Sequence, residues 1–76
     1  MEPQALVALT ERQLQVIHLL ARGGNNATIG AELGVAPRTV IAHCNEIRRR
    51  LGCRRHEIPS AYRAATGIDP WEDENG

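Results

Sequence analysis

The sequence predicts an all-α protein, folded as a compact four-helix bundle. Three observations favour this fold. First, the chain has 76 residues, which is enough for one small domain. Second, it contains no Phe, one Tyr and one Trp, so its core must be built from Leu, Ile, Val and Ala, whereas β-sandwiches usually depend on aromatic and β-branched residues. Third, its apolar residues recur every three or four positions, which is the period of an α-helix.

Thr10 predicts the start of the first helix. Its hydroxyl can accept a hydrogen bond from an amide of the first turn, and Gln13 follows three residues later, as a capping box requires. Gly23 and Gly24 are expected to end this helix. Its apolar stripe consists of Leu14, Ile17 and Ala21, with Val16, Leu19 and Leu20 alongside.

Two further helices are predicted around a tight turn. The first is short, carries Ile29 and Leu33 four residues apart, and ends at Gly34, where the turn requires a positive φ. The second is expected from about Pro37 to Leu51, because proline suits the first turn of a helix. Its apolar seam consists of Val40, Cys44, Ile47 and Leu51.

A fourth helix is expected from about Ile58 to Thr66, ended by Gly67. We therefore predict one domain over residues 9–68. It is preceded by a lead-in segment, residues 1–8, and followed by an acidic tail, residues 69–76, which we expect to be disordered.

The charges of the chain are unevenly distributed. The formal net charge is zero and all nine cations are Arg. Between Thr10 and Thr66 these nine Arg accompany four acidic residues, so this body carries a charge of +5, whereas the last eight residues contain four acids. Arginine forms planar, bidentate hydrogen bonds with phosphates and base edges. The distribution therefore indicates a basic body that can bind nucleic acid.

The helix expected from about Pro37 to Leu51 has a basic outer face. Two short helices joined by a glycine-containing turn, the second with such a face, form a helix-turn-helix. In that motif the second helix enters the major groove and reads base edges from its N-terminal half. The side chains opposite the apolar seam are Arg38, Ala42, Asn45 and Arg49.

The stretches ALTERQLQVIHLLARG and NNATIGAELGVAPRTVIAHCNEIRRRLG, followed by an Ala-rich last helix, resemble the LuxR/FixJ-type (GerE-like) DNA-binding domain. The resemblance covers about Leu9 to Ile68. It implies a four-helix domain that binds double-stranded DNA, usually as a homodimer, and regulates transcription in the bacterial cytoplasm, in association with the nucleoid. The matching positions are Leu9-Thr10-x-Arg12, Val16, Leu19, Leu20, Gly23, Asn26, Ile29, Leu33, Thr39-Val40-x-x-His43, Ile47 and Leu51-Gly52.

The resemblance also implies which residues bind. Residues around Thr-Val in the third helix touch DNA in this family, and the fourth helix commonly forms the dimer contact. Arg54, directly after the third helix, is placed to reach a backbone phosphate. The implied DNA-binding residues are Arg38, Thr39, Ile41, Ala42, Asn45 and Arg49, and the implied dimer residues are Ser60, Ala61, Ala64 and Ala65.

The chain departs from the family pattern on the same face. Ile41 and Ala42 are apolar where relatives often carry Lys or Asn, and Ala36 replaces the usual N-cap Ser of the third helix. We therefore expect fewer phosphate contacts, with base reading by thymine-methyl contacts of the two apolar residues and by Asn45 on adenine.

Other site chemistries have less support. Cys53 and His56 have zinc-ligand spacing, but Cys44 belongs to the core seam, so buried structural thiols are favoured and no metal is expected. A disulfide is disfavoured because the residues between the two cysteines are mostly helical. The sequence has no long apolar run, paired catalytic acids, activated nucleophile or phosphate-binding loop. We thus expect no membrane segment, cofactor, small-molecule substrate or enzyme activity.

The alternative function is a non-catalytic protein-interaction or dimerisation module whose DNA binding is weakened or lost. In that case Ile41 and Ala42 would dock a partner helix, and the acidic tail would shield the basic face or contact the transcription machinery. Salt separates the two hypotheses, because only binding through arginines weakens steeply as salt rises. The operator, the sign of regulation, the input signal and whether the chain is part of a longer regulator stay open.

Overall fold

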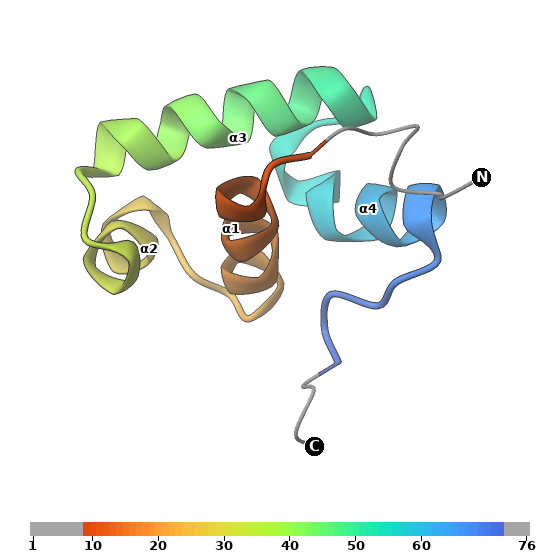
Figure 1. Cartoon of the computed structure of the whole chain (residues 1–76), viewed down its shortest axis with the longest axis horizontal. Helices are drawn as coiled ribbons and strands as arrows, with labels where there is room; N and C mark the ends of the chain where they lie inside the picture. Colours follow the sequence, from red (N-terminus) through yellow and green to blue (C-terminus); the bar gives the residue numbers. More distant parts are fainter. Residues whose placement is uncertain (1–8, 73–76) are drawn as a thin grey trace.

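The computed structural model describes residues 9–72. The expected lead-in, residues 1–8, and the end of the expected acidic tail, residues 73–76, lie outside this description. The described part contains helices and no strand, so the prediction of an all-α fold is confirmed (Figure 1). In chain order its elements are α1 (Glu11–Ala21), α2 (Asn26–Leu33), α3 (Pro37–Leu51), the short 3-10 helix η2 (Arg55–Glu57) and α4 (Ile58–Thr66).

Reciprocal hydrogen bonds start the first two helices. At α1, the Thr10 hydroxyl accepts from the Gln13 amide at 3.1 Å, and the Gln13 side chain accepts from the Thr10 amide at 2.9 Å. This is the predicted capping box. At α2, Asn25 and Thr28 form an equivalent pair, with both bonds at 2.9 Å. These side chains satisfy amides that have no partner within the helix, so the two helix starts are determined locally.

The turn between α2 and α3 brings the two helices close together. Gly34 adopts the predicted left-handed conformation, with φ 73°, and the Val35 amide donates to the Gly30 carbonyl at 2.9 Å. A Cβ atom on Gly30 would lie 2.6 Å from the Val35 carbonyl oxygen. The absence of a side chain at Gly30 therefore permits this close approach, and α2, the turn and α3 form the predicted helix-turn-helix.

The longest helix, α3, lies across the other three. In Figure 1 it runs along the top of the molecule from α2 towards α4, with the beginning of α1 beneath it, and it contacts all three helices. Its predicted seam faces this core, because Val40, Cys44 and Ile47 are buried and Leu51 is half-buried. The opposite face of α3 is left open. The buried apolar cluster consists of Val16, Ile17, Ile29, Val40, Cys44, Ile47, Ile58 and Tyr62.

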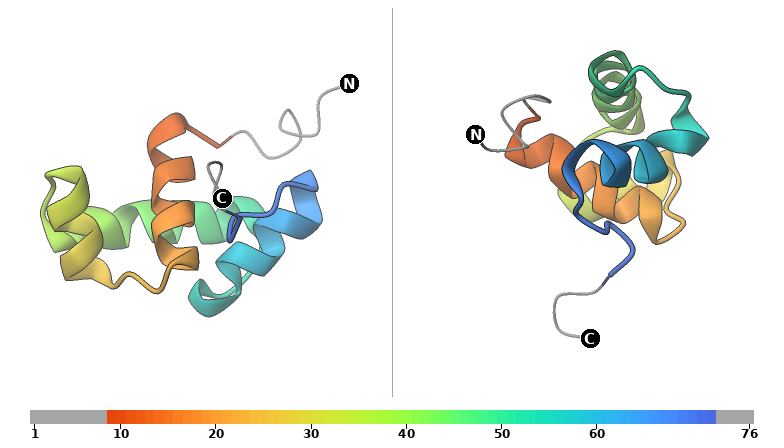
Figure 2. Two further views of the ribbon diagram at one scale, coloured as in Figure 1. Left: turned by 90° about the horizontal axis from the view of Figure 1, so that it is seen from below. Right: turned by 90° about the vertical axis from the view of Figure 1, so that its right-hand side faces the viewer.

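The packed chain continues past Ile68. Pro70 is buried, and its carbonyl oxygen lies 3.3 Å from Nδ1 of His18, whose ring makes an edge-to-face contact with Tyr62. Burial of Pro70 and the position of its carbonyl oxygen near His18 bring this part of the chain against α1. Disorder of the tail, residues 69–76, stays a prediction. Figures 1 and 2 show this segment leaving α4 on the side of the molecule away from α3.

None of the helices in the described residues is long and apolar enough to cross a membrane.

Candidate nucleic-acid interface

The predicted DNA-binding residues of α3 lie on its open face. Five of them are exposed and Thr39 is half-buried at the first turn. Ile41 retains 42% of its accessible surface, although it is a large apolar residue. Their position follows from the helical period, because burial of the seam turns the opposite stripe towards solvent. Contact of these residues with DNA stays a prediction. The five exposed residues are Arg38, Ile41, Ala42, Asn45 and Arg49.

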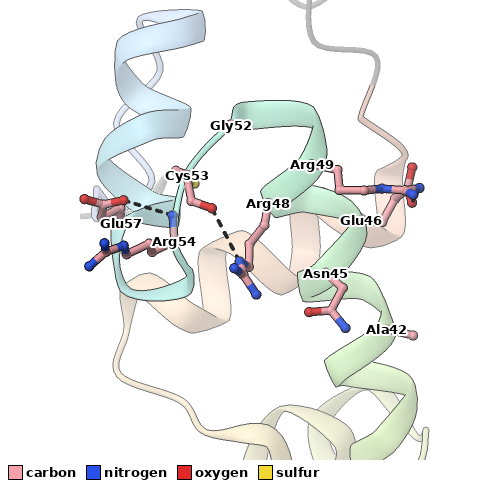
Figure 3. A pocket seen from close by; sticks show the side chains of 9 residues that line it. All are labelled: Ala42, Asn45, Glu46, Arg48, Arg49, Gly52, Cys53, Arg54 and Glu57. Atoms are coloured by element: carbon pink, nitrogen blue, oxygen red, sulfur yellow. Dashed lines mark hydrogen bonds and ion pairs between the residues drawn. The ribbon is translucent and has the colours of Figure 1, made fainter.

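The C-terminal half of α3 borders an open hollow (Figure 3). The chain reverses at Gly52, and this turn brings Arg54 and Glu57 alongside the last turns of the helix. The hollow therefore joins four of the predicted DNA-binding residues, Arg54 among them, whereas Arg38, Thr39 and Ile41 lie outside it. Its lining consists of Ala42, Asn45, Glu46, Arg48, Arg49, Gly52, Cys53, Arg54 and Glu57.

Two hydrogen bonds shape the turn on the far side of the hollow. Nε of Arg48 donates to the Cys53 carbonyl at 3.4 Å, and the Arg54 amide donates to the Glu57 carboxylate at 2.9 Å (Figure 3). The second bond lies at the start of η2, an element that the sequence pattern did not predict. Arg48 therefore has a role in holding the turn, while the side chain of Arg54 is exposed to solvent.

Glu46 pairs with two arginines on the open side of α3. Its Oε1 contacts Nη2 of Arg49, and its Oε2 accepts from Nε of Arg50 at 3.0 Å. These hydrogen bonds, first from Arg50 and then from Arg49, lower the pKa of the Glu46 carboxyl below its ordinary value. Glu46 was not among the residues predicted to form the site. Its spacing of three and four residues from the arginines is the signal that points to it.

Arg38 differs from these paired arginines. It is exposed in the first turn of α3, and within residues 9–72 its side chain makes no hydrogen bond or ion pair. The N-terminal half of the second helix is the part that reads bases in a helix-turn-helix. Among the predicted DNA-binding arginines, Arg38 is the one in the N-terminal half of α3. It could contact a base without breaking a hydrogen bond or ion pair to another residue of the described part of the chain.

The predicted dimer residues lie on the outer side of α4. Ser60, Ala64 and Ala65 are exposed and Ala61 is half-buried, whereas Tyr62 faces the core. Small side chains would allow a second helix to approach closely. Dimerisation itself stays a prediction.

The cysteines are free thiols that pack into the fold. Cys44 is buried in the core and Cys53 is half-buried beside it. Burial raises the pKa of both thiols, so the neutral, unreactive form is favoured. The described residues contain no group of three or more His, Cys, Asp or Glu that could hold a metal ion.

Comparison with known proteins decides the family. The family model GerE, described as "Bacterial regulatory proteins, luxR family", matches residues 7–64, well over half of the chain. The chain belongs to the LuxR family. This match confirms the resemblance found in the sequence and the prediction of a helix-turn-helix domain of the LuxR type.

Two curated relatives are themselves named as regulators. A glycerol metabolism activator of Pseudomonas putida is 37% identical over 67 residues, which make up 88% of this chain and 29% of that protein. The nitrate/nitrite response regulator protein NarP of Escherichia coli (strain K12) is 38% identical over 53 residues, which make up 70% of this chain and 25% of that protein. This LuxR-family chain thus spans less than a third of either relative. No solved structure matches it significantly.

Proposed function

We propose that this LuxR-family domain binds double-stranded DNA sequence-specifically and reads the major groove with α3. The observation that supports the proposal is the open face of α3. Arg38 is exposed there in the first turn, and its side chain has no partner within residues 9–72. That face also carries a hydrogen-bonding side chain, Asn45, and apolar side chains that can contact thymine methyl groups.

The residues divide into base-reading and phosphate-binding groups. Arg38 and Asn45 have the donors that recognise guanine and adenine edges, and Ile41 and Ala42 offer apolar contacts. Thr39, Arg49 and Arg54 suit backbone phosphates, because hydroxyl and guanidinium groups commonly bind them. Arg49 and Arg54 both line the hollow at the end of α3.

The proposal includes a homodimer through α4. Its exposed small residues, Ser60, Ala64 and Ala65, together with the half-buried Ala61, support close helix packing. Two-fold symmetry would place two copies of α3 on two half-sites about one helical turn apart. Such a domain would act on the chromosome in the bacterial cytoplasm and communicate with the transcription machinery.

The alternative, a protein-interaction module with weakened DNA binding, is favoured by one pair of observations. Ile41 is an exposed apolar residue in the N-terminal half of α3, and Glu46 neutralises part of the basic face. A partner helix could pack on such a surface.

Selection from a random duplex library at low and moderate salt, followed by sequencing, tests the proposal. We expect an enriched palindrome, whose half-site spacing reports the dimer geometry. Recovery of DNA without a motif would indicate a backbone binder. No recovery at either salt would favour the protein-interaction module. Arg38→Ala should weaken the enrichment and relax the motif at one position. Arg22→Ala, which removes an exposed arginine at the end of α1, should preserve the motif.

A further inference from the structure

The carboxylate of Glu46 forms ion pairs with two arginines of α3. Glu46 contacts Arg49 through one oxygen and Arg50 through the other. The side chains of these three residues stay in contact with solvent, with 30% of the Glu46 side chain, 76% of that of Arg49 and 41% of that of Arg50 accessible. Together they carry a net charge of +1 where the arginines alone would carry +2.

Glu46 also lies on the surface that the proposed function assigns to DNA. It lines the hollow together with Asn45, Arg49 and Arg54, and Figure 3 shows Glu46 and Arg49 projecting from the same side of α3. A phosphate approaching Arg49 would therefore meet the Glu46 carboxylate and would have to compete with it. The competition is reversible, because ion pairs between exposed side chains are weak.

The affinity of a protein for arbitrary DNA comes mainly from arginine and lysine contacts to phosphates. Pairing of Arg49 and Arg50 with Glu46 reduces this contribution, whereas it does not touch Arg38 at the other end of α3. Glu46 therefore lowers the contribution of the phosphate contacts of α3 and leaves the contribution of the base contact at Arg38 unchanged.

We propose that Glu46 is a specificity-determining residue, which withholds Arg49 and Arg50 from phosphates and so lowers binding to arbitrary DNA relative to the operator. The inference rests on the proposed function, because it assumes that α3 faces DNA. Glu46 acts here as a positioning residue for the two arginines and not as a base contact.

The test compares Glu46→Gln with the wild-type protein on a random-sequence duplex, so no operator needs to be known. Dissociation constants are measured between 50 and 300 mM NaCl. We expect Glu46→Gln to bind roughly three- to tenfold more tightly at the lowest salt. The slope of log K against log salt should steepen by about 0.9 for each additional phosphate contact.

Glu72→Gln is the matched control, because it makes the same charge change at an exposed position in the segment that leaves α4 away from α3. Glu72→Gln should leave the slope of log K against log salt unchanged.

Glu46→Asp, which keeps the charge, should behave more like the wild type than Glu46→Gln does. Arg49→Gln should weaken binding by a larger factor in the Glu46→Gln background than in the wild-type background. Circular dichroism confirms that each variant is folded.

Two results would overturn the inference and are distinguishable. If the wild-type protein binds the duplex and Glu46→Gln has the same slope and affinity, Glu46 does not withhold the arginines, and the proposed function is untouched. If neither protein binds DNA at 50 mM NaCl, the proposed function and the inference fail together.

Discussion

Gly30 is the residue at which the helix-turn-helix tolerates least extra volume. A Cβ atom there would lie 2.6 Å from the Val35 carbonyl oxygen, which is a backbone atom and cannot rotate away. Any larger side chain must push α2 away from the turn, and overpacking of this kind is destabilising.

We predict that Gly30→Leu lowers the free energy of unfolding by about 1–3 kcal/mol or more. Chemical denaturation followed by circular dichroism measures the change. Ala31→Leu is the control, since Ala31 is exposed on the same helix and both substitutions introduce the same side chain. Equal stability of the two variants would show that the turn yields to the added side chain.

Arg38 and Arg49 differ in their contacts and therefore in their expected contribution to DNA binding. Arg38 has no partner among residues 9–72, whereas Arg49 is paired with Glu46. We predict that Arg38→Ala weakens operator binding by about 1–3 kcal/mol and relaxes base preference at one position. Arg49→Ala should cost less, act equally on all sequences and reduce the salt slope by at most about 0.9. A larger loss for Arg49→Ala would reverse this ranking.

The ion pairs of Glu46 also predict a pH dependence of stability. Its pKa is lowered in the folded state, so the stabilisation is present above the unfolded-state pKa, about 4.3, and is lost as pH falls through the lower folded-state pKa. The difference in melting temperature between the wild-type protein and Glu46→Gln should therefore shrink between about pH 5 and pH 3. Melting curves across this range measure it. A difference that stays constant would contradict the assignment.

The N-terminus of α3 begins without a side-chain cap. α1 and α2 each begin with a reciprocal capping box, whereas Ala36, the N-cap of α3, offers no side-chain acceptor. The Pro37 ring at the first position compensates in part, because proline has no amide that needs a partner. The helix that is proposed to enter the groove is thus held mainly by its buried seam.

We predict that Ala36→Ser stabilises the domain by about 1 kcal/mol, because the hydroxyl can accept from an amide of the first turn of α3. The melting temperature should rise by roughly 4–8 °C for a domain of this size. Ala27→Ser, at an exposed position inside α2, is the control and should not stabilise. An unchanged melting temperature would show that the amides in the first turn of α3 gain no hydrogen bond from the new hydroxyl group.

At the scale of the whole molecule, the C-terminal segment is part of the packed structure. Pro70 is buried with its carbonyl oxygen near His18 of α1, and the Asp69 carboxylate accepts a hydrogen bond from the Trp71 amide at 2.9 Å. Within the described residues the tail therefore lies on the side of the molecule away from α3 (Figures 1 and 2). This placement does not support shielding of the basic face by residues 69–72.

We predict that a chain ending at Ile68 is less stable by roughly 1 kcal/mol or more, since it exposes the surface that Pro70 covers. Its melting temperature should fall by several degrees, about 4–8 °C per kcal/mol. Replacing Asp69 by Asn and Glu72 by Gln, which keeps the chain length, should change neither stability nor nonspecific DNA binding appreciably. Markedly tighter DNA binding by that double variant would restore the shielding hypothesis.

Much of the fold was predictable because it depends on short-range interactions. The capping box of Thr10 and Gln13, the positive φ of Gly34 and the apolar seam of α3 involve neighbours within one or two turns. Periodicity likewise placed Arg38 and Asn45 on the open face. The pairing of Glu46 has the same short range and was available from spacing, but an outer-face acid was not recognised as part of the site.

The sequence by itself therefore determined the four α-helices, the family and the exposed stripe of α3. The tertiary structure alone decided which residues share the hollow, because the turn at Gly52 has to bring Arg54 and Glu57 alongside α3. It alone decided the position of the tail as well, since the contact of His18 with Pro70 joins residues 52 positions apart. Contacts of that range depend on how completed helices pack, and no local pattern encodes them.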